Sequence, residues 1–344
     1  MLRIENVYKK LGDFQLKDIN LEIKKGEYFV ILGPTGTGKT VILEVIAGMY
    51  KPDKGNVYHG ENDLSSLYPE KREIGFVYQD YALFPHLTIR ENIIFGLKIR
   101  KFSKEKIKQK LDEIVSILKI EHLLNRYSNT LSGGEQQRAA IARALITSPK
   151  ILLLDEPLSA LDPSTKEELQ KMLKEIHEKM KTTTIHITHD FNEAFYLADR
   201  IAILENGTIA QVGTSNEIFK KPKDAYVANF VGMENIFKGR IMDRTINISP
   251  DVNIEIDSDK DGDANIAFRP EDVMVSENPG TFDCKNKFCG KITNIMNKGP
   301  LYKMDIDIGV KLTSLVPVKT IENMNISYGD EVWVGFEDSS LHIF

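Results

Sequence analysis

The segment that decides the fold is EYFVILGPTGTGKT, residues 27–40. Its first half is an apolar run that predicts a buried strand, and KTVILEVIAGMY, residues 39–50, has the apolar spacing of a helix. Between them GPTGTGKT, residues 33–40, matches the pattern G-x-x-x-x-G-K-[ST] of a phosphate-binding loop. The loop does not complete G-x-G-x-x-G, which argues against a dinucleotide-binding fold.

The residues of this loop have separate expected roles. Gly33, Gly36 and Gly38 let backbone N–H groups surround a β-phosphate without a clash from Cβ. Lys39 supplies positive charge to the β- and γ-phosphates, and the Thr40 hydroxyl binds Mg²⁺. The predicted nucleotide-binding residues of the loop are Gly33, Pro34, Thr35, Gly36, Thr37, Gly38, Lys39, Thr40 and Val41.

Three further polar residues extend the expected site. ILLLDEP ends an apolar strand with two carboxylates, of which we expect Asp155 to hold Mg²⁺ and Glu156 to act as general base on water. At the end of TTTIHITH, residues 182–189, we expect His189 to bind the γ-phosphate and orient that water, whereas His186 is packed. The predicted catalytic residues are therefore Lys39, Glu156 and His189.

Gln79, in GFVYQDY, is a neutral ligand that can reach Mg²⁺ and water and then withdraw, which suits a sensor of the nucleotide. We therefore predict that the metal ligands are Thr40, Gln79 and Asp155, and that Gln79 also belongs to the nucleotide site.

Length and composition limit the alternatives. The chain has 344 residues, which is enough for two domains. Its net charge is −5, so it does not have the positive field that non-specific nucleic-acid binding needs. Cys284 and Cys289 are the two cysteines, so no disulfide framework is expected and a reducing cytoplasm fits. No run of 18 apolar residues is present, so we expect a partner to bring the chain to a membrane if it acts there.

The order of apolar segments indicates two domains. Alternating strands and helices up to residue 230 predict a parallel sheet covered on both faces, with a helical subdomain at about residues 80–145. The lysine-rich run KFSKEKIKQKLDEIVSIL is expected to be a solvated helix face. From residue 231 short strands and Gly, Asn and Asp turns predict an all-β domain, residues 231–344. From Gly232 onward it holds 12 basic and 19 acidic residues, a net charge of −7.

A second phosphate-like sequence, LSGGEQQ, begins another helix. Ser132 and Glu135 form the pattern of a capping box, and capping alone does not explain Gly133 and Gly134 in the first turn. Glycines there leave backbone N–H groups bare to an anion, but the segment has no lysine of its own. It therefore looks like half of a phosphate site.

These motifs together resemble the ATP-binding-cassette ATPases. GPTGTGKT, VYQD, LSGGEQQR, ILLLDEP, SALD and THD occur in that family in this order and spacing, over residues 1–230. The resemblance implies ATP and Mg²⁺ as cofactors and a head-to-tail dimer in which Ser132, Gly133 and Gly134 complete the partner's ATP site. It also implies that Asp162 lies at the interface and communicates between the two sites.

Further implications of the resemblance concern partners. Residues 80–95 would form the groove that receives a short helix of a transmembrane permease subunit, and a solute-binding protein would act outside the cell through that permease. The expected location is peripheral, at the cytoplasmic face of the cell membrane. Importers of the family often stack adenine on an aromatic residue at the place of Leu11; here Phe14, ahead of Tyr8, is the predicted substitute.

The C-terminal part resembles the oligomer-binding-fold extension of importer ATPases, including FRPEDV, and ends like the oxyanion-binding module of molybdate and tungstate importers. The module's Ser-x-Arg-Asn and Lys-Ala-Ser-Ser correspond here to residues 283–286 and 337–340, where Asp283, Glu337 and Asp338 repel an anion. The residues predicted to bind a regulatory oxyanion are Lys285, Asn286, Ser339 and Ser340. A tail that only stabilises the dimer is the alternative.

The expected function is therefore that of the ATP-hydrolysing subunit of an importer, for molybdate or tungstate. An importer for sulfate, ferric iron, a polyamine or a sugar is the alternative, because the cassette itself does not contact the solute. A soluble cassette ATPase that acts on ribosomes or DNA would carry two cassettes or a long coiled coil, which this sequence lacks. An RNA-binding regulator is disfavoured by the acidic C-terminal part.

Overall fold

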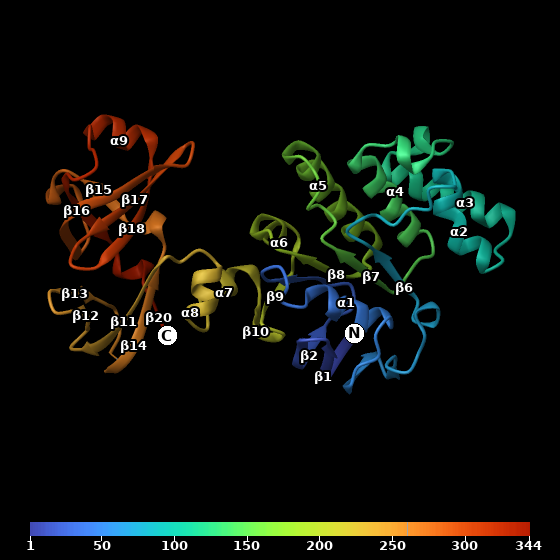
Figure 1. The fold of residues 1–344 in the computed structure, drawn as a ribbon, viewed down its shortest axis with the longest axis horizontal. Coiled ribbons are helices and arrows are strands. Elements are labelled where there is room, and N and C mark those ends of the chain that lie inside the picture. The colour runs from blue at the N-terminus through green and yellow to red at the C-terminus, as the bar shows by residue number, and fades with distance from the viewer. Residues whose placement is uncertain (260) are drawn as a thin grey trace. The chain divides into compact units, whose positions relative to one another are not determined.

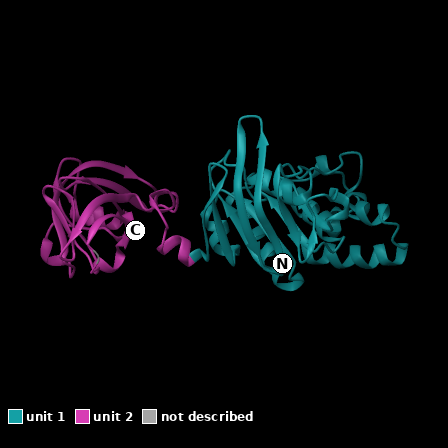
Figure 2. Cartoon of the chain, turned by 90° about the horizontal axis from the view of Figure 1, so that it is seen from below, with its two compact units in different colours: residues 1–215 teal, residues 216–344 magenta. Residues whose placement is uncertain are grey.

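The computed structural model describes residues 1–259 and 261–344. The chain divides into two compact units, unit 1 with residues 1–215 and unit 2 with residues 216–344 (Figure 2). Among the described residues, no helix combines the length and the apolar character that crossing a membrane requires.

Unit 1 is built around a six-stranded sheet in the order β10-β9-β3-β8-β7-β6 (Figure 1). Neighbouring strands are parallel except β9 and β10, which form an antiparallel hairpin. The strands are β3 (Tyr28–Leu32), β6 (Ile74–Val77), β7 (Ile151–Asp155), β8 (Thr183–Thr188), β9 (Arg200–Glu205) and β10 (Thr208–Gly213). The predicted parallel sheet is confirmed, and β3, β8 and β7 are direct neighbours at its centre.

A four-stranded antiparallel sheet and the first helix cover one face of this sheet. Ile151 and Leu153 of β7 lie in the same core cluster as Ile42 and Leu43 of the helix, because alternate residues of a strand point to the same face. The elements are β1 (Leu2–Leu11), β2 (Phe14–Ile23), β4 (Lys54–His59), β5 (Asn62–Asp63) and α1 (Lys39–Ala47).

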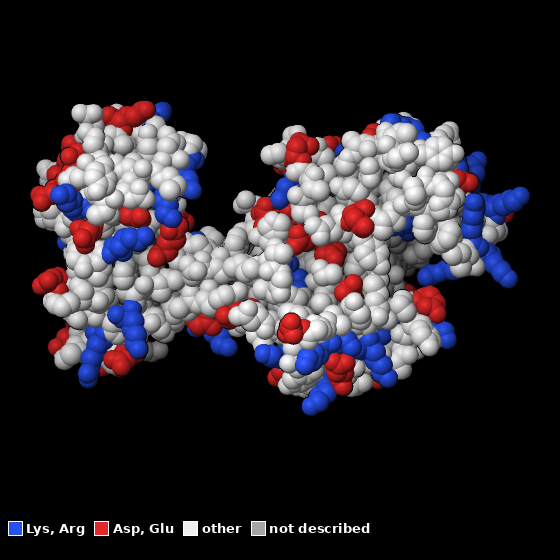
Figure 3. Space-filling view, viewed as in Figure 1, with Lys and Arg blue, Asp and Glu red and all other residues white. Residues whose placement is uncertain are grey.

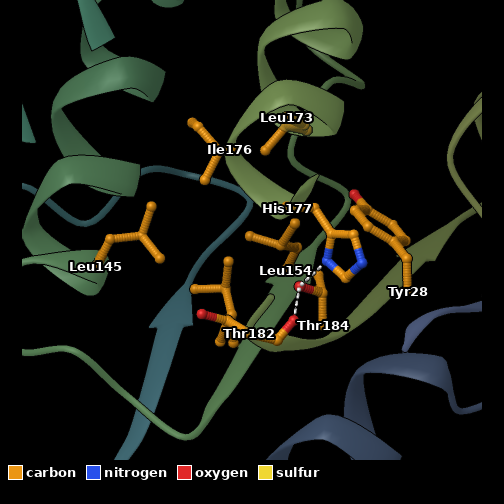
Figure 4. Close-up of a pocket in the computed structure, with 9 residues that line it drawn as sticks. Tyr28, Leu145, Leu154, Leu173, Ile176, His177, Thr182 and Thr184 are labelled. Carbon is orange, nitrogen blue, oxygen red and sulfur yellow. Dashed lines mark hydrogen bonds between the residues drawn. The ribbon is translucent and has the colours of Figure 1, made fainter. Parts of the chain in front are cut away.

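The intervening residues of the strands face the opposite layer of helices. Leu154 of β7 and Tyr28 of β3 line a small cavity there together with Leu173 and His177 (Figure 4). The helices of unit 1 beyond α1 are α2 (Ile89–Ile99), α3 (Lys104–Leu118), α4 (Gly133–Leu145), α5 (Pro163–Met180) and α6 (Phe191–Leu197). Short 3₁₀ turns span Pro69–Lys71, Glu121–Leu123 and Ser128–Thr130.

Helices α2, α3 and α4 form the predicted helical insertion, at the β6 end of the sheet (Figure 1). Helix α3 buries Leu111, Ile114, Val115 and Leu118, whereas its lysines at 104, 106 and 108 are exposed. Lysine and arginine side chains project into solvent at this end of unit 1 (Figure 3). The lysine-rich run is thus a solvated face, as expected from its 3.6-residue apolar period.

Unit 2 begins with two short helices, α7 (Ser215–Lys220, whose first residue belongs to unit 1) and α8 (Ala225–Phe230). Two five-stranded antiparallel sheets follow, in the orders β13-β12-β11-β14-β20 and β15-β19-β16-β17-β18. The strands of the first sheet are β11 (Asn235–Met242), β12 (Thr245–Ser249), β13 (Val252–Glu255), β14 (Gly262–Phe268) and β20 (His342–Ile343).

The second sheet contains β15 (Met274–Ser276), β16 (Asn286–Asn297), β17 (Leu301–Asp307), β18 (Lys311–Pro317) and β19 (Glu331–Phe336), with helix α9 (Val318–Met324) after β18. Short 3₁₀ turns span Pro270–Asp272, Pro279–Thr281 and Asp338–Ser340. One apolar cluster holds residues of both sheets, including Ile266 and Val334. The strands therefore form a single β domain with one core.

The two units divide after Ser215, the first residue of α7, whereas the change in composition suggested residue 231. The Arg269 guanidinium donates to the backbone oxygens of Phe219 (2.9 Å) and Val231 (3.0 Å) and lies 3.2 Å from the centre of the Phe219 ring. The His342 ring contacts the backbone oxygen of Pro222 at 2.8 Å. Both contacts bind the connecting helices to the β domain, and neither partner is close in sequence.

Candidate active site

The phosphate-binding loop joins β3 to α1. Gly36 and Gly38 have φ angles of +84° and +100°, which a residue with a Cβ rarely adopts. At Gly38 a Cβ would also lie 2.1 Å from the Phe14 ring, so this position requires glycine for space as well as for backbone conformation. The N-terminal end of α1 follows directly, with its free N–H groups, which is the arrangement that binds phosphate.

A cavity of about 410 Å³ lies at this loop. It brings together part of the predicted set, from four separate segments of the chain. The lining residues are Leu11, Phe14, Thr35, Gly36, Gly38, Lys39, Thr40, Val41, Gln79 and Glu156. Phe14 thus lies at the predicted site, beside Leu11 whose place it was expected to take.

The remaining loop residues hold the lysine. The Lys39 ammonium donates to the backbone oxygens of Gly33 (2.8 Å) and Pro34 (3.0 Å), and Thr37 also donates to Pro34 (2.8 Å). The Lys39 side chain is only 5% exposed and lies 3.7 Å from Glu156. Burial lowers the pKa of Lys39, and the neighbouring carboxylates oppose this change. An anionic phosphate in the cavity would stabilise the charged form further.

Asp155 and Thr40 meet at the end of β7. The Thr40 hydroxyl donates to Asp155 Oδ1 at 3.2 Å, and burial raises the pKa of the Asp155 carboxyl against this hydrogen bond. A buried carboxylate of this kind is stabilised by a cation. A hydroxyl and a carboxylate at this contact, with the Gln79 amide in the wall of the same cavity, are the hard oxygen donors that suit Mg²⁺, so these residues fit the metal.

Glu156 is the next residue, and its backbone is strained. Its φ is +41°, in the left-handed region that a glutamate rarely adopts. The backbone N–H donates to Ile187 of the adjacent strand at 3.0 Å, and the carboxylate lies 3.2 Å from His189 Nδ1. This conformation directs the carboxylate between Lys39 and the largely exposed His189 ring. His186, in contrast, is fully buried, as predicted.

The second phosphate-like sequence lies elsewhere in unit 1. Ser132 caps α4 and forms the predicted capping box with Glu135, whose carboxylate accepts from the Ser132 N–H at 2.8 Å. Ser132 and Gly134 line a separate cavity of about 270 Å³, which none of the phosphate-loop residues lines. Within one chain, the two sequences are therefore not part of one site.

The structure gives Gly134 a reason that the sequence did not suggest. A Cβ there would lie 2.7 Å from Thr165 Cγ2 of α5, so glycine is needed for close packing of two helices. Exposure of backbone N–H groups to an anion is therefore not the only reason for glycine in the first turn of α4. Asp162 likewise has a local role, because its carboxylate accepts from the backbone N–H groups of Ser164 (3.2 Å) and Thr165 (3.1 Å) and caps α5.

The comparison with known proteins agrees with this geometry. Residues 16–159 match the family model described as ABC transporter. The molybdate/tungstate import ATP-binding protein WtpC of Pyrococcus abyssi is 42% identical over 345 residues, which covers 100% of both chains. The Fe(3+) ions import ATP-binding protein FbpC of Fusobacterium nucleatum is 37% identical over 348 residues, covering 100% of this chain and 93% of the relative.

Among solved structures, an ATP-binding cassette determined as a dimer in a post-hydrolysis state with ADP and Pi is 37% identical. Its TM-score is 0.57, and the match covers 62% of this chain and 99% of that chain.

The chain belongs to the ABC transporter family. Unit 1 is accordingly an ATP-binding cassette, and the expected fold, ATP binding and ATP hydrolysis are confirmed. The roles of the individual site residues stay predictions, supported by the cavity that gathers them.

One residue that shapes the cassette's site was not found from the sequence. The Arg143 guanidinium, in the last turn of α4, donates to the backbone oxygens of Ala82 (2.6 Å) and Tyr81 (3.0 Å). Both of these residues have positive φ angles, in the loop that follows Gln79. Arg143 therefore fixes the shape of that loop from the helix that Ser132 begins. An arginine at the end of a helix is common, so no local signal marks it.

In unit 2 the predicted oxyanion ligands already have partners. Lys285 lies 3.6 Å from Asp338, and the Ser339 hydroxyl donates to Glu337 at 2.9 Å. The backbone N–H of Ser340 donates to the backbone oxygen of Glu337 at 3.2 Å.

The prediction for Asn286 needs correction. This residue is 2% exposed, and its amide accepts from the Glu255 N–H (2.7 Å) and donates to the Glu255 oxygen (2.9 Å). These two hydrogen bonds join β16 to β13. The asparagine amide is thus part of the core of the β domain and is not directed toward a ligand.

Proposed function

We propose that this chain is the ATP-hydrolysing subunit of an importer for molybdate or tungstate. The observation that carries the catalytic part is the single cavity in which the phosphate loop, Gln79 and Glu156 meet, with Asp155 and His189 in contact with its lining. The solute is supported by the full-length similarity to a molybdate/tungstate import protein at 42% identity, against 37% for an iron import protein.

The predicted site residues have separate tasks in this proposal. The loop N–H groups and Lys39 bind the phosphates of ATP, and Phe14 stacks on the adenine. Thr40, Asp155 and Gln79 hold Mg²⁺, which when bound neutralises charge on the phosphate oxygens. Glu156 accepts a proton from the attacking water, and His189, 3.2 Å from it, orients that water toward the γ-phosphate.

Two copies of the chain complete one ATP site. Support comes from the separation of the two cavities within one chain and from the related cassette solved as a dimer with ADP and Pi. Ser132 and Gly134 of one copy then face the γ-phosphate on Lys39 of the other, and Asp162 lies at the interface. Loss of that phosphate removes the bridge between the copies and lets them separate.

The dimer acts on a transmembrane permease at the cytoplasmic face of the membrane, and an extracytoplasmic solute-binding protein delivers solute to that permease. The groove for the permease helix is supported by Phe84, whose ring lies 4.7 Å from that of the partly exposed Phe95. The Arg143 guanidinium lies over the Phe84 ring, 5.5 Å from its centre, and also donates to the loop after Gln79. Arg143 therefore connects the groove to the loop that follows the nucleotide-site residue Gln79.

The experiment that tests this function is transport by the purified complex. The tagged full-length chain is expected to bring down a multi-spanning membrane protein from detergent extracts. Vesicles containing that complex should take up molybdate and tungstate when ATP is supplied, and should ignore sulfate and ferric iron. Vesicles with the Glu156→Gln chain are the control. Recovery with ribosomes or nucleic acid alone would reject the importer, and uptake of another solute would reject only the substrate.

Unit 2 is proposed to act as a regulatory domain that senses excess oxyanion weakly, or else only to stabilise the dimer. The acidic partners of Lys285 and Ser339 support a low affinity. Titration of the complex with molybdate, tungstate and sulfate, with the ATPase rate as readout, separates the two roles. Inhibition by the first two anions supports regulation, and indifference to all three leaves the stabilising role.

A further inference from the structure

A buried polar chain lies behind the exposed His189 ring, at the start of two helices. Lys166, in the first turn of α5, contacts Asp190 Oδ2 at 2.6 Å and Glu193 Oε1 at 2.7 Å. Asp190 directly follows His189 and caps α6 by accepting from the N–H groups of Asn192 and Glu193. One ammonium group therefore ties the start of α6 to the start of α5.

The contacts continue from α6 to two strands of the sheet, β8 and β3. Glu193 is 2% exposed, and its Oε2 lies 3.3 Å from His186 Nε2. The other ring nitrogen of His186 is 3.0 Å from the Tyr28 hydroxyl. Tyr28 belongs to β3, the strand that leads into the phosphate loop, and its ring meets His177 of α5 edge-on (Figure 4).

The Glu193 carboxylate carries its charge where water is scarce. Although burial favours the neutral acid, contacts with His186 and Lys166 lower the pKa of Glu193 to about 2. The carboxylate is therefore ionised near neutral pH, and it needs its cationic partner to remain buried. Among the described residues, Lys166 is the lysine or arginine that forms an ion pair with Glu193.

The position of His189 depends on what holds its loop. Its ring is 54% exposed and contacts Glu156 at 3.2 Å, which does not by itself fix the loop. Lys166 holds the residue immediately after it, and α5, which carries Lys166, begins at the Asp162 cap. A movement of α5 at its Asp162 end would therefore be passed through Lys166 to Asp190, the residue next to His189.

We propose that Lys166 is a positioning residue for ATP hydrolysis, which holds His189 against Glu156 by tying α6 to α5. The inference rests on the proposed roles of His189 and Glu156. Lys166 does not line the ATP cavity. Its effect is on the turnover step, because the phosphate loop that binds ATP stands on α1 and β3 and has no contact with Lys166 in the described residues.

The test uses the full-length chain with Lys166→Met, Lys166→Arg and a matched control, Lys171→Met, which removes an exposed lysine of the same helix paired with Glu167. Since misplaced catalytic groups cost up to about 100-fold, kcat should fall between about 10- and 100-fold in Lys166→Met while KM for ATP stays within about 2-fold. The Lys166→Arg variant should recover most of kcat, and Lys171→Met should match the parent. Equal kcat in Lys166→Met and the parent overturns the proposal.

A structural role alone is separated by two further measurements. The double variant Lys166→Met/Glu193→Gln removes the buried carboxylate together with its lysine and leaves only Asp190, which the N–H groups of α6 still stabilise. Its kcat should still be low at a melting temperature near that of the parent. In a His189→Ala background, Lys166→Met should change kcat by less than about 2-fold, because it acts through the missing ring. If Lys166→Met lowers kcat by the same factor in the His189→Ala chain as in the parent, the inference is overturned. A fully active His189→Ala chain would instead overturn the proposed catalytic role of His189.

Discussion

The ATP cavity of unit 1 and the oxyanion cluster of unit 2 invite comparison, because both were expected to bind anions. At the ATP cavity the buried Lys39 ammonium donates to the carbonyls of Gly33 and Pro34 and lies 3.7 Å from Glu156, beside the free N–H groups at the start of α1. At the cluster the cation faces a carboxylate, since Lys285 lies 3.6 Å from Asp338.

The difference shows what prepares a site for an anion. Both lysines have a carboxylate neighbour, so the difference is that the backbone N–H groups of the loop and of α1 add positive potential at the ATP cavity. The cavity also holds the strained Glu156, with φ +41°, a conformation that the fold stabilises at a cost. In unit 2 the corresponding polar groups, above all Asn286, are used to hold strands together.

The largest effect is expected from Glu156→Gln. An amide cannot accept the proton from water, so ATP turnover should fall by about 10²- to 10⁴-fold while ATP binding is kept. Turnover and nucleotide affinity of the purified chain measure the two properties separately. A variant that hydrolyses ATP at the ordinary rate would place the general base elsewhere and would remove the contrast between cavity and cluster.

Mixing two inactive variants tests whether the cavity is completed by a second copy. Chains with Lys39→Ala and chains with Ser132→Arg should each lose turnover. Their mixture should regain activity well above the sum of the two, because a mixed dimer contains one intact pair of loops. A mixture that stays as inactive as its components would confine the site to one chain.

Asn286→Ala tests the structural role assigned to that residue. Two buried hydrogen bonds to the Glu255 backbone are lost and their partners are left unsatisfied, so unit 2 should lose about 2–4 kcal/mol of unfolding free energy. Denaturant unfolding measures this loss. The control is Asn294→Ala, at an exposed position of the same strand. Unchanged stability with reduced oxyanion binding would restore Asn286 as a ligand.

The pH dependence of stability tests the buried charge behind the cavity. Glu193 has an ordinary pKa of 4.5 and a folded pKa of about 2, so its contribution to stability is present above pH 4.5 and is lost as the pH falls toward 2. Urea unfolding between pH 5 and pH 2.5 should therefore show a weaker pH dependence in Glu193→Gln, which has no carboxylate to protonate, than in the parent. Equal slopes would mean that Glu193 is not held ionised.

The smallest effect is expected from releasing the lysine of the cluster. Asp338→Ser removes the partner of Lys285, and because surface ion pairs are weak the affinity for molybdate should rise by at most about 5-fold. Calorimetry of the full-length chain measures this change. Asp251→Ser, an exposed change of the same charge in the same unit, is the control. An equal rise in both variants would reflect net charge alone.

Local signals account for what could be predicted from the sequence. The strand before Gly33, the helix after it and the capping box at Ser132 each depend on residues within a few positions, and the structure contains all three. The contacts of Arg143 with Ala82 and of Lys166 with Asp190 could not be predicted, because each joins residues far apart in the sequence that are common at such positions. The same holds for Arg269, which places α7 and α8 with unit 2.

The phosphate loop could be predicted from residues 33–40 alone, since its glycine conformations and the start of α1 follow from adjacent residues. Only the tertiary structure decided which loops meet there: the strand order β3-β8-β7 brings the ends of three parallel strands to one edge, so that Lys39, Glu156 and His189 converge. It also decided which polar groups remain available to a ligand, because the partner that occupies Asn286 lies in another strand.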